Sequence, residues 1–228
     1  MIKINNILIN AFQEKEDFLN YIIDKKKILI AINAEKILKD DKRLQEIING
    51  NIGYPDGVGA VMALRQKGID AIKIAGAEFW LDIVEHFYRE RSFYLLGSSQ
   101  EVIDGTVERL KNEFESIDIV GYRNGFLDEA DKVELKKTLV EKKPDIVFVA
   151  QGTPRQEYLM DELIKVHPAL YMGLGGSFDV YCGLKKRAPK LFIDLQLEWL
   201  YRLLKEPTRI RRQWILAKFL FMLKIGKL

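Results

Sequence analysis

Two glycine-containing segments combine small residues with side chains suited to anion binding. Gly97–Gln100 and Gly152–Glu157 each follow a short apolar run and precede an amphipathic stretch. Free N–H groups and the dipole at the start of a helix favour phosphate, and Arg155 adds a positive charge to the second segment. Both segments are therefore suited to a diphosphate. Neither has the pattern of a dinucleotide-binding fingerprint or of a Walker A loop.

The second segment also has the pattern of a helix cap. Thr153 and Gln156 have the Thr-x-x-Gln spacing of a capping box, with Pro154 at the first helical position. A cap and a ligand site can use the same residues, so both interpretations stay open.

An aspartate lies in a turn-forming segment, Tyr54–Gly59. The proline and glycines around Asp56 predict a tight loop before an apolar helix over Ala60–Arg65, and the spacing alone favours a capping or turn role for this residue. A carboxylate on such a loop is instead a candidate general base if it faces a cleft. Gly175 and Gly176 follow another apolar run, where they would form a turn or let the backbone approach a ligand.

The chain alternates between short apolar runs and amphipathic stretches. The runs predict buried strands over Ile28–Asn33, Phe93–Gly97, Ile117–Gly121, Ile146–Ala150 and Leu170–Leu174. The amphipathic stretches predict helices over Ser99–Phe114, Glu129–Lys142 and Gln156–Val166. This alternation indicates βαβ units, so we expect an α/β fold with a Rossmann-like parallel sheet covered by helices and a C-terminal helical appendage.

The two parts of the chain differ in charge. Leu184–Leu228 contains 12 Lys and Arg residues against three acidic ones, whereas residues 1–183 contain 24 basic and 30 acidic ones. We expect an α/β core over residues 1–188 and a basic, amphipathic appendage over residues 189–228.

Within the appendage, the pattern predicts one helix over Phe192–Lys205, a break at Pro207 and a second helix from Thr208 or Arg209. The second helix has an apolar end, Trp214–Ile225. Positive charge beside apolar and aromatic residues predicts docking to an anionic membrane surface. A solvated helix face, or packing into a dimer or the core, is the alternative.

Composition excludes several classes of protein. With 228 residues, 48% hydrophobic and 30% charged, the chain is not a disordered, collagen-like or disulfide-stapled protein. Cys182 is the single cysteine, and His86 and His167 are far apart, so we interpret all three as structural and expect no His-cluster metal site. The N-terminus lacks the pattern of a signal peptide, and no apolar run reaches the roughly 20 residues of a membrane span. These features predict a cytoplasmic protein.

Eight segments carry a family resemblance in their order along the chain. They are Asn33–Lys36, Pro55–Gly59, Leu95–Gly97, Gly121–Phe126, Gly152–Glu157, Gly175–Asp179, Lys186–Pro189 and Leu197–Leu203. Together they cover nearly the whole chain and resemble the WecG/TagA/CpsF glycosyltransferases.

The resemblance implies a bacterial enzyme at the inner face of the cell membrane, with a UDP-sugar donor and a polyprenyl-diphosphate-linked acceptor. The TagA branch transfers N-acetylmannosamine to lipid-linked N-acetylglucosamine in wall teichoic acid synthesis, and other branches use N-acetylmannosaminuronic acid or glucose. The general base of the family corresponds to Asp56, an asparagine of the same cleft to Asn33, and a donor-side glutamine to Gln156.

Further site residues follow from the motifs and from the charge of the appendage. We expect substrate contacts from Lys73, Gly97, Thr153, Arg155, Gly175 and Gly176, and contacts to the membrane or the acceptor diphosphate from Arg187, Arg202, Arg209, Arg211 and Arg212. The chain departs from the family pattern in having Ala31 in place of a frequent Thr, Lys73 in place of Arg and Glu78 in place of Asp. The change from Arg to Lys removes bidentate phosphate geometry.

No Asp-x-Asp metal motif follows a strand, since Asp128–Asp131 opens a helix instead. We therefore expect no metal cofactor, with helix N-termini and Arg or Lys side chains stabilising the leaving diphosphate.

Two other classes fit less well. A nicotinamide-dependent oxidoreductase would need a glycine fingerprint that is missing. A nucleic-acid-binding protein would explain the basic end of the chain but not the turn motifs of the acidic part. The expected partners are thus the donor, the lipid-linked acceptor and an anionic membrane surface, with no nucleic acid; a homo-oligomer is left open.

Overall fold

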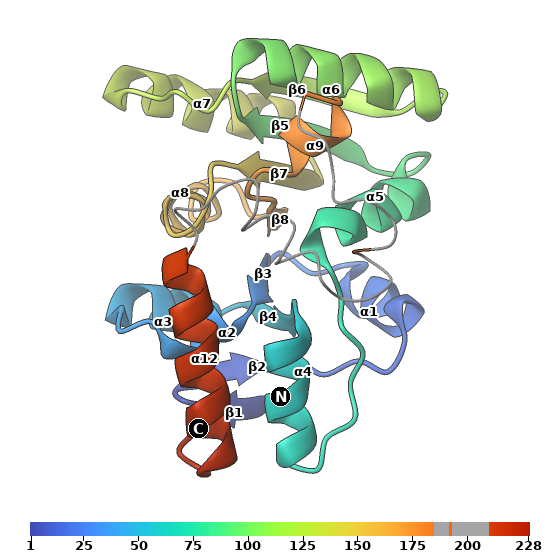
Figure 1. Ribbon diagram of the computed structural model, residues 1–228. Helices are drawn as coiled ribbons and strands as arrows, with labels where there is room; N and C mark the ends of the chain where they lie inside the picture. Colours follow the sequence, from blue (N-terminus) through green and yellow to red (C-terminus); the bar gives the residue numbers. More distant parts are fainter. Residues whose placement is uncertain (185–191, 193–209) are drawn as a thin grey trace.

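The computed structural model describes residues 1–184, 192 and 210–228, and its main feature is a parallel sheet. Six strands lie in the order β4-β3-β8-β7-β5-β6, and every neighbouring pair is parallel (Figure 1). The strands are β3 (Ile28–Ile32), β4 (Ile52–Pro55), β5 (Ser92–Gly97), β6 (Asp118–Arg123), β7 (Ile146–Ala150) and β8 (Leu170–Gly173). The predicted α/β fold with a Rossmann-like parallel sheet is confirmed.

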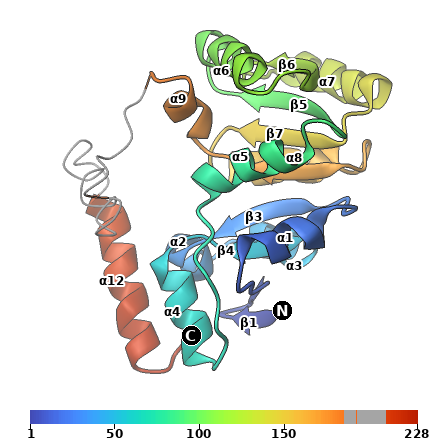
Figure 2. The same cartoon turned by 90° about the vertical axis from the view of Figure 1, so that its right-hand side faces the viewer.

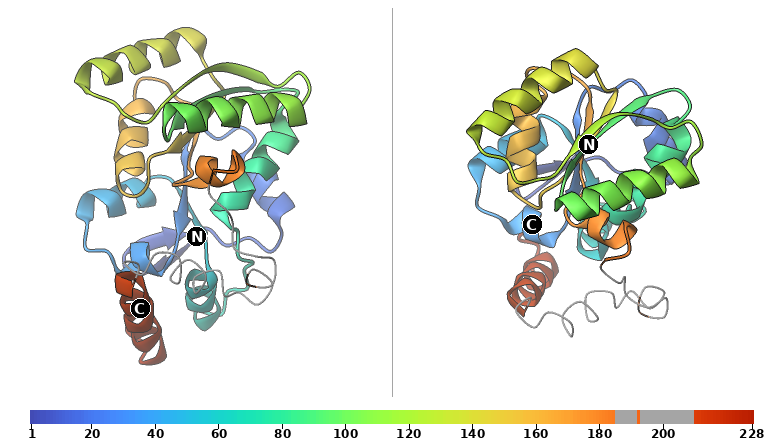
Figure 3. Two further views of the ribbon diagram at one scale, coloured as in Figure 1. Left: turned by 45° about the horizontal axis from the view of Figure 1, so that its top comes forward. Right: turned by 90° about the horizontal axis from the view of Figure 1, so that it is seen from above.

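Helices cover both faces of this sheet, because side chains alternate along each strand. In β5, Phe93 and Leu95 enter one apolar cluster, while Tyr94 and Leu96 enter the other. The first cluster is covered by α1 (Lys15–Ile22), α5 (Gly76–Phe87), α6 (Gln100–Glu113) and α9 (Ser177–Tyr181). The second is covered by α2 (Ala34–Leu38), α3 (Lys42–Asn49), α4 (Val58–Gln66), α7 (Glu129–Lys142), α8 (Arg155–Leu163) and α12 (Ile210–Lys224). Figure 3 shows α7 and α8 on one side of the sheet and α6 on the other.

The predicted elements are present with shifted ends. The helix over Glu129–Lys142 is confirmed at both ends, while the predicted strand over Ile117–Gly121 runs over Asp118–Arg123 as β6. The prediction of a loop from Tyr54 was wrong, since β4 continues through Pro55. Pro55 fits because β4 is an edge strand of the six-stranded sheet.

A short antiparallel hairpin, β1 (Ile2–Ile4) and β2 (Ile7–Ile9), lies beside β4. The backbone N–H of Asn10 donates to the carbonyl of Gly53 at 2.7 Å, which joins the hairpin to that edge. The three isoleucines Ile4, Ile7 and Ile9 are fully buried in the cluster that α12 also covers. The hairpin therefore closes the core at the edge of the sheet.

The C-terminal helix α12 packs against the body of the protein, beside α4 (Figure 2). Phe219 and Leu223 are buried in the same cluster as the sheet, and a Cβ on Gly59 would lie 3.2 Å from the Phe219 ring. The amide of Gln66 donates to the carbonyl of Leu223 at 2.8 Å. Packing into the core, one of the alternatives for this segment, is thus correct for one face of α12. The predicted helix over Phe192–Lys205 and the break at Pro207 lie outside the described residues, apart from Phe192.

The two faces of α12 predict opposite outcomes for two phenylalanines. Phe219 is fully buried, whereas 63% of Phe221 is exposed. We expect Phe219→Ala to lower the free energy of unfolding by about 3–5 kcal/mol, because it removes buried contacts and leaves a cavity. Phe221→Ala should change it by no more than about 0.5 kcal/mol. Urea unfolding followed by circular dichroism measures both; equal effects would contradict the packing of α12.

Candidate active site at the carboxyl edge of the sheet

The parallel strands bring the sequence motifs to one edge of the sheet, where all six strands end. The strand β5 leads through α6 to β6, and its neighbour β7 leads through α8 to β8. The helices α6 and α8 lie on opposite faces of the sheet, and β6 and β8 lie on opposite sides of the β5–β7 pair. In open α/β sheets, ligands bind at such a reversal of strand order, beyond the carboxyl ends of the strands. The fold therefore places a ligand site between β5 and β7.

A cavity of about 950 Å³ lies at this reversal point. It is lined by residues from the ends of β5 to β8 and from the neighbouring helices: Arg43, Ser98, Ser99, Gly125, Phe126, Leu127, Lys132, Ala150, Gln151, Gly152, Arg155, Tyr158, Leu159, Glu162, Gly175, Gly176 and Asp179. Its volume is at the upper end of the range of roughly 300–1,000 Å³ found for small-molecule sites. A nucleotide-sized ligand fits this space.

The loop after β5 forms one wall of the cavity, and its backbone requires glycine. Gly97 has φ +142°, and a Cβ there would lie 2.4 Å from the carbonyl oxygen of Ala150. Ser98 follows in the left-handed region with φ +56°, and its hydroxyl donates to Oδ2 of Asp179 at 2.6 Å. Strained backbone of this kind concentrates at functional sites. The contact fixes the Asp179 carboxylate at the cavity wall.

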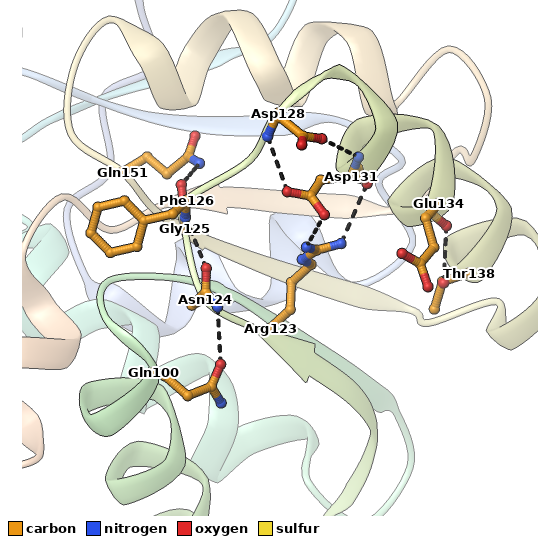
Figure 4. A network of polar contacts seen from close by, with 10 residues as sticks. All are labelled: Gln100, Arg123, Asn124, Gly125, Phe126, Asp128, Asp131, Glu134, Thr138 and Gln151. Atoms are coloured by element: carbon orange, nitrogen blue, oxygen red, sulfur yellow. Dashed lines mark hydrogen bonds and ion pairs between the residues drawn. The ribbon is translucent and has the colours of Figure 1, made fainter.

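The loop after β6 presents an aromatic ring to the cavity. Gln151 donates to the carbonyl of Gly125 at 2.7 Å, and the side chain of Asn124 accepts from the N–H of Phe126 and donates to Gln100 (Figure 4). These bonds fix the backbone on both sides of the ring, and yet 75% of Phe126 is exposed. An exposed ring on a held loop is a platform on which a planar ligand can stack.

The acidic segment that follows starts α7, as the sequence predicts. Asp128 and Asp131 form a reciprocal capping box, and Asp131 also pairs with Arg123 at 2.8 Å (Figure 4). Within residues 1–184, 192 and 210–228, no group of three or more His, Cys, Asp and Glu side chains is arranged to hold a metal ion. The expectation of metal independence stays a prediction.

Basic side chains line the cavity from three helices: Arg43, Lys132 and Arg155. The Arg43 guanidinium lies 4.5 Å from the centre of the Tyr158 ring and 3.8 Å from a carboxylate oxygen of Glu162. The Tyr158 hydroxyl donates to Asp41, the N-cap of α3, and this bond together with the N–H of Leu44 lowers the pKa of Asp41. A charged acceptor thereby anchors Tyr158, and Tyr158 in turn supports Arg43.

Gln156 connects the loops after β7 and β8. Its side-chain oxygen accepts from the N–H groups of Gly152 at 3.1 Å and Gly175 at 2.9 Å. The capping-box interpretation was wrong: α8 begins at Arg155 with Pro154 as its N-cap residue, and the hydroxyl of Thr153 donates to Glu157 instead. The geometry gives Gln156 the task of holding two cavity loops together, and its predicted contact with a donor stays a prediction.

Asn33 and Asp56 lie at the other end of the same edge, after β3 and β4. Asn33 caps α2 by accepting from the N–H of Lys36 at 3.0 Å. Asp56 is half-buried with Oδ1 3.4 Å from the N–H of Gly76, and it does not cap α4, whose N-cap residue is Gly57. At about 4.8 Å per strand, β4 and β7 are roughly 14 Å apart. Asp56 and Asn33 therefore lie on the same edge as the cavity but are not among the residues that line it.

A buried ion pair lies between these two parts of the edge. Nζ of Lys36 lies 2.8 Å from Oε1 of Glu157, with only 6% and 1% of the two side chains exposed. Nζ also donates to the carbonyl of Ala31 at 2.9 Å, and Oε1 also accepts from Thr153. Because Lys36 lies on α2 and Glu157 on α8, the pair spans the strand β8 between them.

Tyr54 lies on β4 shortly before Asp56, at the same end of the edge, as a neutral phenol. Burial raises its pKa well above the ordinary value, and the negative charges of Asp56 and Glu157 raise it further. Its hydroxyl is buried without a hydrogen-bond partner among the described residues, and a Cβ on Gly76 would lie 2.7 Å from it. Tyr54 is thus a hydrogen-bond donor at neutral pH and not a base.

The structure separates the predicted site residues into groups. Arg155, Gly175 and Gly176 line the cavity, with Gly97, Thr153 and Gln156 next to lining residues in the chain. Asn33, Asp56 and the exposed Lys73 belong to the end of the edge at β3 and β4, where the N–H of Ile74 donates to the carbonyl of Pro55. Arg211 and Arg212 fall in the first turn of α12, while Arg187, Arg202 and Arg209 lie outside the described residues.

Several residues of the site were not among those predicted from the sequence. Arg43, Lys132, Tyr158 and Glu162 project from helices, and no local pattern marks them. Phe126, Asp179, Lys36 and Glu157 lay within quoted motifs, and the Gly-Phe and Phe-Asp pairs after apolar runs were a usable signal for the first two.

The fold and the site define an α/β protein with a basic, glycine-walled ligand cavity at the reversal point of a parallel sheet. The family model described as "Glycosyl transferase WecG/TagA/CpsF family" matches residues 2–227. The chain therefore belongs to the WecG/TagA/CpsF glycosyltransferase family.

Removing the lysine of the buried pair should lower stability far more than removing the lysine of an exposed pair. We expect Lys36→Met to lower the free energy of unfolding by about 3–5 kcal/mol, because it leaves the carboxylate of Glu157 buried without its counter-charge. Lys15→Met is the matched control, since Lys15 pairs with Asp82 at 2.6 Å at a far more exposed position. Its effect should stay below about 1 kcal/mol. Denaturant titrations of both variants decide; a loss at Lys36 no greater than at Lys15 would contradict the burial of the pair.

Proposed function

We propose that this glycosyltransferase transfers N-acetylmannosamine from UDP-N-acetylmannosamine to N-acetylglucosamine linked to undecaprenyl diphosphate, as in synthesis of the wall teichoic acid linkage unit. The observation that carries the proposal is the cavity between β5 and β7, on a chain of this family. Its size, its glycine walls and its basic side chains suit the UDP portion of a donor.

Each part of a UDP-sugar finds a matching group on this edge. The exposed ring of Phe126 suits stacking of the uracil, since base–aromatic stacking needs only a flat apolar face. The carboxylate of Asp179 suits a ribose hydroxyl as a hydrogen-bond acceptor. The diphosphate suits the N-termini of α6 and α8, beside Arg155. The departing UDP gains negative charge, which these groups stabilise.

The acceptor belongs at the end of the edge near Asp56. In an inverting transfer, the acceptor hydroxyl oxygen forms a bond to the anomeric carbon on the face opposite UDP. The bond from that carbon to the phosphate oxygen breaks, its electron pair leaves with UDP, and Asp56 takes the hydroxyl proton. In this proposal Asn33 orients the acceptor, Lys73 meets phosphate, and the arginines from Arg187 to Arg212 bind the acceptor diphosphate.

Asp56 gives the test of this mechanism. Asp56→Asn should lower the rate of transfer by roughly 10²–10⁴-fold, the usual contribution of a general base, with little change in stability. Asp70→Asn, at an exposed position next to Arg65, is the control and should retain full activity. Transfer is measured with UDP-N-acetylmannosamine, UDP-N-acetylmannosaminuronic acid and UDP-glucose. Faster transfer from either of the last two would replace the proposed donor, and near-normal turnover by Asp56→Asn would remove Asp56 from the mechanism.

We also propose that the protein docks on the inner face of the cell membrane through the outer face of α12. Trp214 and Phe221 are exposed on this face, seven residues apart with Lys218 between them, and Ile225 is exposed in the turn directly after the helix, four residues beyond Phe221. Exposed apolar rings among lysines suit the interface of an anionic leaflet. None of the helices in the described part of the chain is long and apolar enough to cross a bilayer.

Exposed residues of α12 allow this docking to be tested without unfolding the protein. The triple variant Trp214→Ser/Phe221→Ser/Ile225→Ser should bind anionic vesicles about tenfold more weakly, because it removes the side chains that enter the interface. Val133→Ser/Val140→Ser is the control, since both valines are exposed on α7. Flotation at moderate salt measures binding. Equal flotation of the triple variant and the wild type would contradict the docking face.

A further inference from the structure

Lys36 organises the acceptor end of the edge with both its backbone and its side chain. Its N–H donates to Oδ1 of Asn33 at 3.0 Å, and its ammonium group donates to the carbonyl of Ala31 at 2.9 Å. The residue therefore fixes the side chain of Asn33 and the last residues of β3 together.

Glu157 organises the donor end in the same way. Its Oε1 accepts from the hydroxyl of Thr153 at 2.9 Å and from Nε2 of Gln156 at 3.3 Å. The oxygen of Gln156 in turn holds the N–H groups of Gly152 and Gly175. Glu157 thus connects, directly or through one amide, to the loops after β7 and β8 that wall the cavity.

The contact between Lys36 and Glu157 closes a continuous polar chain from Asn33 to Gly152. Both side chains are almost fully buried, and Oε2 of Glu157 has no hydrogen-bond partner among the described residues. A buried pair adds little stability compared with well-packed apolar side chains of the same volume. Its bonds nevertheless restrict the relative placement of the two groups that it joins, because separating them would leave a buried charge without its partner.

We propose that Lys36 and Glu157 are positioning residues that set the distance between the acceptor subsite at Asn33 and Asp56 and the donor subsite at Gly152–Arg155. This inference rests on the proposed transfer reaction. Neither residue touches the reacting atoms in this account. A misplacement of about 1 Å between reacting groups can cost roughly 10²-fold in rate, so a link of this kind acts on turnover.

The double variant Lys36→Met/Glu157→Gln tests the proposal. It removes both charges, nearly conserves both volumes and keeps an oxygen for Thr153. We expect the melting temperature of the wild type, because both charges are removed together. UDP affinity should stay within about threefold, because each subsite is intact, while kcat should fall about 30–100-fold. Lys15→Met/Asp82→Asn, which removes an ion pair away from the site, is the control and should keep wild-type kcat.

A double variant with wild-type stability and kcat within threefold of the wild type would overturn the proposal. If that variant does not fold, Glu157→Asp alone decides, because it keeps the charge pair and shortens the side chain by one methylene. In folded protein, kcat should fall about tenfold with UDP affinity unchanged, and an unchanged kcat would overturn the positioning role. Rates are compared on the UDP-sugar that the wild type transfers fastest. A different donor would thus overturn only the donor assignment, and the ratio of variant to wild type would still decide the role of the pair.

Discussion

The buried ion pair between Lys36 and Glu157 is the constraint on which the site depends. A charge taken out of water must meet an opposite charge at close range, and the two groups meet at 2.8 Å. Lys36 lies on α2, after β3, and Glu157 lies on α8, after β7. Because β8 lies between β3 and β7 in the sheet, the pair joins two helices that cover the same face across β8. Asn33 accepts from the backbone N–H of Lys36, Thr153 donates to Oε1 of Glu157, and Gly152 donates to Gln156, whose amide donates to the same Oε1.

With this link in place, the edge of the sheet offers the two subsites that the proposed transfer needs. The cavity between β5 and β7 has glycine walls, basic side chains and the exposed ring of Phe126. The ends of β3 and β4 carry Asn33 and Asp56. In the proposed inverting transfer, the leaving group and the attacking hydroxyl occupy opposite sides of one carbon, so the donor and the acceptor need separate subsites. In the proposed function the cavity binds the nucleotide of the donor, and Asp56 takes the proton of the acceptor hydroxyl.

Much of the fold could be predicted from local patterns. The apolar runs ending in Gly97 and Ala150 became β5 and β7, because short β-rich runs bounded by turn residues admit few alternatives. The strand through Pro55 was missed because proline normally opposes a strand, and only its edge position permits it here. The three-residue strands of the N-terminal hairpin are too short to show a period.

Site residues could be predicted from the sequence only where a loop needs a particular backbone conformation. Gly97 and Gly175 have positive φ, a conformation that favours glycine, so the residue type itself indicates the loop. Contacts between distant helices leave no local record, so the pair of Lys36 with Glu157 and the support of Arg43 by Tyr158 emerged only from the structure. The same limit explains Thr153: its spacing to Gln156 fits a cap, but the buried carboxylate of Glu157 accepts its hydroxyl instead.

In the proposed function, the donor occupies the cavity between β5 and β7 while the acceptor meets Asp56. A crystal structure of the full chain with UDP tests it most directly. The account predicts the uracil against the ring of Phe126, a ribose hydroxyl at Asp179 and the diphosphate at the N-termini of α6 and α8, with its free end toward Asp56. UDP bound against Asn33 and Asp56, with the cavity unoccupied, would contradict it.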